Sequence, residues 1–94
     1  MTQVRKILIA DDDNDLRSAL AEQLAFHPEF SVIQADCAQA AMAAAKEHAP
    51  DLVLMDVGLP DLDGREAVKK MREAGFKNPV IMLTGHDTDE DTVV

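Results

Sequence analysis

Oxygen-bearing side chains follow three separate apolar runs of the sequence, at the point where each run ends. Val4–Ala10 leads into Asp11–Asp13, Leu52–Met55 leads into Asp56, and Val80–Leu83 leads into Thr84. If these runs are parallel strands of one sheet, their carboxyl ends meet at the edge where open α/β sheets bind ligands. Converging carboxylates repel one another, so such a cluster indicates a bound cation or a site that transfers an anionic group.

Three aspartates, Asp11, Asp12 and Asp56, are the candidates for this chemistry. They lie far apart in the sequence, so only the fold can bring them together. If the first and third runs are neighbouring strands, their ends lie about 5 Å apart. Mg²⁺ suits such a site, because it binds a few carboxylate oxygens and keeps several waters for phosphate oxygens. A carboxylate beside such an ion can act as a nucleophile toward phosphorus and form an aspartyl phosphate.

The segments between the apolar runs predict the elements that position these aspartates. We expect strands over residues 4–10, 30–35, 52–56 and 80–84, and helices over residues 15–26, 38–48 and 64–74. Leu16, Leu20 and Leu24 share one face of the first helix, and the acids of residues 89–91 could open a fourth helix. This alternation predicts a parallel sheet with helices on both faces, joined by right-handed crossovers.

The composition indicates one folded domain and argues against a nucleic-acid-binding or a membrane-spanning protein. Its 94 residues suffice for one domain, 47% of them are apolar, and Cys37 is the single cysteine. Acidic residues outnumber basic ones 18 to 9, and this net charge of −9 argues against direct contact with nucleic acid. We find no signal peptide and no segment long enough to span a membrane. A cytoplasmic, reducing compartment fits these features.

Four stretches of the sequence carry a resemblance to a known family. They are ILIADDD at 7–13, LVLMD at 52–56, LPDLDG at 59–64 and VIMLTG at 80–85. Together and in this order they resemble the receiver domain of bacterial two-component response regulators, over essentially the whole chain. The resemblance implies one receiver domain over residues 1–94 with a flavodoxin-like, doubly wound α/β fold. Its parallel strands would lie in the order 2-1-3-4.

The same resemblance implies a role for each site residue. Asp56 is similar to the phosphoacceptor, which takes a phosphoryl group from a histidine kinase or a phosphotransfer protein. Asp12 corresponds to the direct Mg²⁺ ligand, Asp11 acts mainly through water, and Asp56 and the backbone carbonyl of Gly58 complete the metal site. Thr84 matches the switch hydroxyl that bonds the phosphoryl oxygen after transfer. The implied function is a phosphorylation-controlled switch, and not an enzyme.

The sequence departs from the family pattern at its C-terminus. Receivers continue with a fifth strand that ends in a characteristic lysine and with a last helix, whereas no lysine follows Lys77 here. We therefore expect a domain that is incomplete at the C-terminus. The fourth strand would then be an apolar edge that is open to a homodimer or a domain swap.

Other interpretations of the same residues stay open at this point. Asp11–Asp13 could simply cap the first helix, Asp56 could start a turn, and threonine ends many strands. The chain could also be a phosphate-independent interaction module, or an Mg²⁺-dependent phosphohydrolase with an aspartate nucleophile. Such hydrolases carry a D-x-D pattern, which residues 11–13 formally contain, but the LPDLDG stretch has no role in that scheme.

Overall fold

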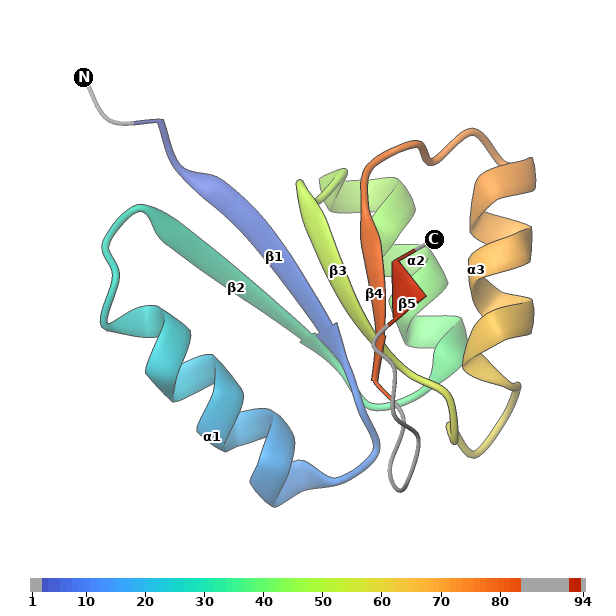
Figure 1. The fold of residues 1–94 in the computed structure, drawn as a ribbon, viewed down its shortest axis with the longest axis horizontal. Coiled ribbons are helices and arrows are strands. Elements are labelled where there is room, and N and C mark those ends of the chain that lie inside the picture. The colour runs from blue at the N-terminus through green and yellow to red at the C-terminus, as the bar shows by residue number, and fades with distance from the viewer. Residues whose placement is uncertain (1–2, 84–91, 94) are drawn as a thin grey trace.

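The computed structural model describes residues 3–83 and 92–93 of the chain. Strands and helices alternate along it (Figure 1). Their order is β1 (Arg5–Ala10), α1 (Asn14–Ala25), β2 (Phe30–Ala35), α2 (Ala38–His48), β3 (Leu52–Asp56), α3 (Gly64–Glu73), β4 (Val80–Leu83) and β5 (Thr92–Val93). The predicted elements therefore form. Their bounds differ from the prediction by one residue at the start of β1, at both ends of α1 and at the end of α3. Residue 84, the predicted end of β4, lies outside the described residues.

The first four strands are parallel and lie in the order β2-β1-β3-β4, as predicted. In the β1–β3 register, Ala10 lies opposite Met55, so both strands end at the same edge of the sheet. Three of the predicted site residues, Asp11, Asp12 and Asp56, gather at this edge. In the next pair, Asp56 lies opposite Leu83, which brings the end of β4 to the same place.

The free edge of β4 differs from the prediction, which left it exposed. Thr92–Val93 pairs with it in antiparallel orientation, with Val93 opposite Ile81 and Thr92 opposite Met82. An edge strand presents unpaired N–H and C=O groups that an extended segment can satisfy, and the sequence pattern gave no sign of so short a partner. The helix start considered at residues 89–91 lies outside the described residues, as does Thr84.

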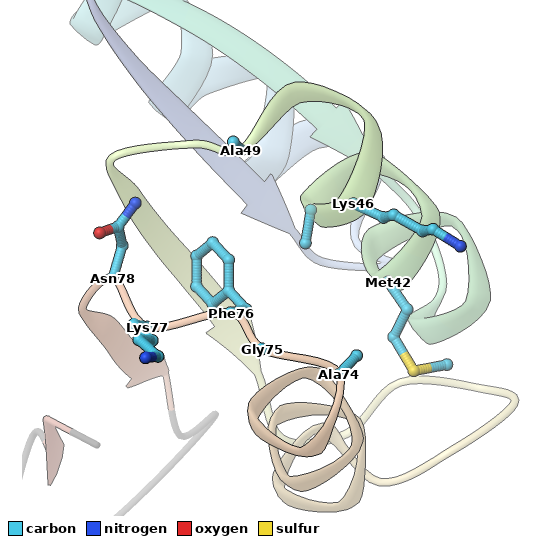
Figure 2. Close-up of a pocket in the computed structure, with 9 residues that line it drawn as sticks. Met42, Lys46, Ala49, Ala74, Gly75, Phe76, Lys77 and Asn78 are labelled. Carbon is cyan, nitrogen blue, oxygen red and sulfur yellow. The ribbon is translucent and has the colours of Figure 1, made fainter.

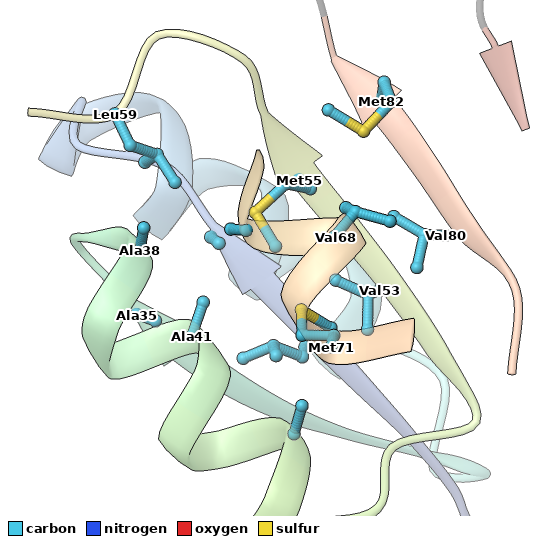
Figure 3. Close-up of a cluster of buried hydrophobic side chains, with 14 residues drawn as sticks. Ala35, Ala38, Ala41, Val53, Met55, Leu59, Val68, Met71, Val80 and Met82 are labelled. Carbon is cyan, nitrogen blue, oxygen red and sulfur yellow. The ribbon is translucent and has the colours of Figure 1, made fainter. Parts of the chain in front are cut away.

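The larger part of the core lies between the sheet and the two helices α2 and α3 (Figure 3). Leu8, Val53, Met55 and Val80 are fully buried on this face of the sheet. The side of α2 that meets them is made of small residues, Ala38, Ala41 and Ala45, which are all buried. Small side chains let α2 lie close to the sheet, and α3 contributes Ala67, Val68 and Met71.

The opposite face of the sheet is covered less completely. Ile7 and Ile9 of β1 are buried there, and α1 packs on this side along β2 (Figure 1). Within the described chain, however, no residue of α1 is fully buried. Leu16, which helical spacing placed on the packed face, is 46% exposed. The expectation of an apolar contact face along the whole of α1 is therefore wrong at its first turn.

Candidate metal centre

The ends of β1 and β3 bring three carboxylates together. Asp56 is the last residue of β3, and Asp11 and Asp12 follow directly after β1, its neighbour in the sheet. One carboxylate oxygen from each of the three lies within 4.8 Å of the other two. The structure therefore places the aspartates as the sequence interpretation required.

Asp11 is the innermost of the three and is 4% exposed. Its Oδ1 accepts a hydrogen bond from the backbone N–H of Asp13 at 2.9 Å. Its backbone carbonyl accepts one from Nη1 of Arg17 at 2.7 Å, and Arg17 Nε donates to Gln34 Oε1 at 3.0 Å. Arg17 thus ties α1 and β2 to the acidic turn. This role of Arg17 was not predicted, although a basic residue in the first turn of the helix was an available signal.

Asp56 is half-buried, and its Oδ1 accepts a hydrogen bond from the backbone N–H of Gly58 at 3.3 Å. Burial raises the pKa of the Asp56 carboxyl above its usual value, and the negative charges of Asp11 and Asp12 raise it further. The Gly58 N–H lowers it but does not offset these effects. Such crowding of carboxylates is relieved when a cation binds among them.

The donor set fits a hard divalent cation. The three side chains offer only oxygen atoms, which Mg²⁺ prefers over nitrogen or sulfur ligands. Asp12 is exposed, while Asp11 is buried and Asp56 is half-buried, so the cluster is open to solvent on one side. An open side suits Mg²⁺, because this ion usually keeps several of its waters.

The loop after Asp56 is fixed by a close backbone approach at its far end. Gly64 N–H donates to the carbonyl of Val57 at 2.9 Å. A Cβ at Gly64 would collide with the carbonyl oxygen of Asp56, so a side chain cannot be accommodated there without a backbone shift. Gly58 has no such constraint, because no described atom lies within 4 Å of a Cβ built at that position. Gly64 was predicted as the first residue of the third helix, and this contact was not predicted.

Thr84, the predicted switch hydroxyl, lies outside the described residues, so the structure does not place it. The end of β4 does lie beside the candidate site, because Val57 N–H donates to the carbonyl of Leu83 at 3.1 Å.

A hollow of about 500 Å³ lies elsewhere, between the C-terminal ends of α2 and α3. Figure 2 shows the ring of Phe76 between Ala49 and Gly75, with Met42 on the other side of the hollow. The hollow therefore lies near the opposite edge of the sheet from the carboxylates. The chemistry of the residues, and not the size of the hollow, therefore identifies the candidate site.

Comparison with known proteins decides the family. The profile of the response regulator receiver domain matches residues 7–94. The chain belongs to this family. It is thus a receiver domain of the two-component response regulators of bacteria, as the sequence resemblance predicted.

Among curated proteins, this receiver domain is similar to two bacterial regulators. It is 36% identical over 90 residues to the alkaline phosphatase synthesis transcriptional regulatory protein PhoP of Bacillus subtilis. It is 34% identical over 93 residues to the regulatory protein AtoC of Escherichia coli. These matches cover 96% and 99% of the chain but only 37% and 20% of the two relatives. The chain therefore spans well under half the length of either protein.

Solved structures show the same fold. The signal receiver domain of the response regulator NarL from Mycobacterium tuberculosis superimposes with a TM-score of 0.84 at 25% identity. This similarity covers 92% of the present chain and 70% of the NarL chain. A DNA-binding response regulator of the LuxR family from Staphylococcus aureus gives a TM-score of 0.81 at 27% identity, over 90% of this receiver domain and 72% of that chain. Over residues 3–83 and 92–93, no helix of the receiver domain is long and apolar enough to cross a membrane.

Proposed function

We propose that this receiver domain accepts a phosphoryl group on Asp56 in an Mg²⁺-dependent reaction. The observation that carries the proposal is the meeting of Asp11, Asp12 and Asp56, with carboxylate oxygens within 4.8 Å of one another. A histidine kinase or a phosphotransfer protein would be the donor, in keeping with the family. Asp12 would bind the ion directly, Asp11 mainly through water, and Asp56 and the Gly58 carbonyl would complete the protein ligands.

The geometry around Asp56 suits a carboxylate nucleophile. The Gly58 N–H bonds to Oδ1 and orients the carboxylate, and Oδ2 would be the oxygen that attacks phosphorus. A new bond forms from the carboxylate oxygen to phosphorus, while the bond from phosphorus to the donor histidine nitrogen breaks and the electron pair stays on that nitrogen. When bound, Mg²⁺ supplies positive charge that neutralises the transferring phosphoryl group. Asp11, which is buried and held by the Asp13 N–H, fixes the inner wall of the site.

The output of the reaction would be a conformational switch. Thr84 follows β4, whose end lies beside Asp56, and its hydroxyl would bond the phosphoryl oxygen after transfer. That contact would remodel the loops after β3 and β4 and so switch the interaction surface of the domain. We propose that the domain acts as a switch and does not catalyse a reaction on another molecule. One relative is named a protein-glutamate methylesterase/protein-glutamine glutaminase, but the match covers only 22% of that protein.

The charge of the chain and the free edge of its sheet bear on the partners of this domain. The net charge of −9 argues that this domain does not contact nucleic acid directly, whatever a larger regulator does. We place it in the cytoplasm as one domain over residues 1–94. In the described residues, the β4 edge pairs with β5 at Ile81 and Met82, and the same edge is where a second copy could add a strand.

Labelling by a small phosphodonor tests the proposal. The chain is incubated with acetyl phosphate with and without Mg²⁺, and the bound phosphoryl group is detected by intact mass. Labelling should require Mg²⁺ and should disappear in Asp56→Asn. Asp36→Asn is the matched control, because Asp36 is an exposed carboxylate just after β2 at the same edge. Persistent labelling of Asp56→Asn would place the acceptor elsewhere and overturn the proposal.

A further inference from the structure

A carboxylate from one loop caps a helix that belongs to another part of the chain. Asp61 lies in the loop between β3 and α3, yet its Oδ1 accepts from the backbone N–H of Ala38 at 2.8 Å. Its Oδ2 accepts from the N–H of Gln39 at 2.9 Å. Ala38 and Gln39 are the first two residues of α2, whose N–H groups have no partner within the helix. Asp61 therefore satisfies two donors that the helix cannot satisfy itself.

The local cap of α2 is a different residue and uses a different donor. Cys37 is the N-cap, and its Sγ accepts from the Ala40 N–H at 3.4 Å. The backbone N–H groups of Ala38 and Gln39, with a smaller contribution from the Cys37 thiol, hold the pKa of Asp61 below its usual value. Two groups therefore cap the start of α2. One is the Cys37 thiol, a weak local acceptor, and the other is the charged Asp61 carboxylate from the loop between β3 and α3.

The loop between β3 and α3 is held at several points, and the attachment of Asp61 to α2 is one of them. At its beginning, the Gly58 N–H bonds to Asp56. Leu59 is buried in the core, and the next anchor along the chain is Asp61 on α2. Gly58 itself is exposed, and no described atom lies within 4 Å of a Cβ built on it, so the bond from its N–H to Asp56 holds it and side-chain packing does not. Its position depends on what secures the segment to either side.

We propose that Asp61 is a positioning residue for the metal centre, because it secures on α2 the loop that carries Gly58, whose carbonyl would bind the ion in the proposed function. The inference rests on the proposed function, since it concerns the same site. It assigns to Asp61 no contact with the ion or the phosphoryl group. Residues that orient metal ligands in this indirect way typically alter metal affinity by about 10- to 100-fold when they are replaced.

Metal affinity separates this role from a purely structural one. In Asp61→Ala, the dissociation constant for Mg²⁺ should rise about tenfold. Asp61→Asn keeps one acceptor oxygen and should fall between Asp61→Ala and the parent chain, and it also carries the test if Asp61→Ala fails to fold. Asp51→Asn is the matched control. Asp51 Oδ2 accepts from the Lys6 N–H at 2.8 Å, which is the same kind of bond at the opposite edge of the sheet.

Cys37 supplies a second measurement that does not depend on phosphorylation. It is the single cysteine of the chain and lies half-buried beside Asp61. If the loop and the metal centre are coupled, Mg²⁺ must stabilise the attachment to α2 as much as the attachment favours Mg²⁺. Alkylation of Cys37 by iodoacetamide should therefore slow when Mg²⁺ is added to the parent chain. In Asp61→Ala it should be faster and insensitive to Mg²⁺.

The outcomes distinguish this inference from the proposed function. If the parent chain binds no Mg²⁺, the proposed function fails and the inference fails with it. If the parent chain binds Mg²⁺ and Asp61→Ala binds it equally well, the inference alone is overturned. An equal loss of affinity in Asp51→Asn would also overturn it, because the effect would then follow general destabilisation. A loss that is confined to Asp61 variants, with Mg²⁺-dependent protection of Cys37 in the parent chain, supports it.

Discussion

The carbonyl oxygen of Asp56 lies against the Cα of Gly64, so closely that a Cβ on Gly64 would overlap with it. The last residue of β3 and the first residue of α3 therefore meet in space, although a seven-residue loop (57–63) separates them. The Gly64 N–H bonds to the Val57 carbonyl at 2.9 Å and closes this loop at its neck. The candidate nucleophile is thus held at the base of a closed loop.

Gly64→Ala should destabilise the fold by about 1–3 kcal/mol, because the added methyl group must displace the strand end that carries Asp56. Gly58→Ala in the same loop is the matched control, since no described atom stands where its Cβ would be. Urea unfolding of both variants measures the difference. Equal losses of unfolding free energy would show that the Asp56–Gly64 contact is not tight.

Asp12→Ala should lower the affinity for Mg²⁺ by at least about tenfold, because it removes one of three oxygen donors from the cluster. Asp36→Ala removes a negative charge from the same edge of the sheet but not from the cluster, so its affinity should stay close to that of the parent chain. Isothermal titration with Mg²⁺ gives both values. A similar decrease in the two variants would mean that general acidity, and not a defined site, attracts the ion.

The stabilising effect of Asp61 should depend on pH in a defined direction. Its hydrogen bonds to the N–H groups of Ala38 and Gln39 hold its pKa in the folded state below the ordinary 3.8. A carboxylate of this kind contributes stability above the pKa that it has in the unfolded chain, and this contribution is lost as the pH falls through the folded-state value. The gap in unfolding free energy between the parent chain and Asp61→Asn should be constant near neutral pH.

Below pH 3.8 the same gap should shrink, because protonation removes the charge from Asp61 in both states. Denaturant unfolding at a series of pH values follows it. A gap that persists unchanged in acid would show that the charge of Asp61 does not strengthen its bonds to α2.

The two faces of the sheet should respond differently to the loss of a leucine. Leu8→Ala opens a cavity in the core that is shared with α2 and α3, where Leu8 is fully buried, and should cost about 2–5 kcal/mol. Leu16→Ala removes a side chain of α1 that is already 46% exposed and should cost less than about 1 kcal/mol. Thermal or urea unfolding compares them. Similar costs would mean that α1 packs more closely than the structure shows.

Most of the fold could be predicted from the sequence because its signals are local and periodic. Each apolar run ends at a turn former or an acid, so the bounds of β2, α2 and β3 were predicted to the residue. The meeting of Asp11, Asp12 and Asp56 could be predicted as well, since the carboxyl ends of parallel strands share one edge.

The features that could not be predicted are contacts between distant segments of the chain, which leave no periodic pattern in the sequence. The bond from Arg17 to the Asp11 carbonyl and the bonds from Asp61 to α2 arise only when loops and helices take their places in the fold. The pairing of Thr92–Val93 with β4 is of the same kind, since a two-residue strand has no pattern to detect. Leu16 failed as a predicted packed residue because spacing identifies a face, and not what lies opposite it.

Paramagnetic broadening by Mn²⁺, which binds the oxygen ligands of Mg²⁺ sites, tests most directly whether the three aspartates form one cation site. In amide spectra of the chain, substoichiometric Mn²⁺ should first broaden the signals of Asp12, Asp56 and Gly58. Lys6 and Asp51, which meet at the opposite edge of the sheet, should keep sharp signals, and added Mg²⁺ should reverse the effect. Broadening that begins elsewhere, or that spreads evenly over the acidic surface, would contradict a single metal centre beside Asp56.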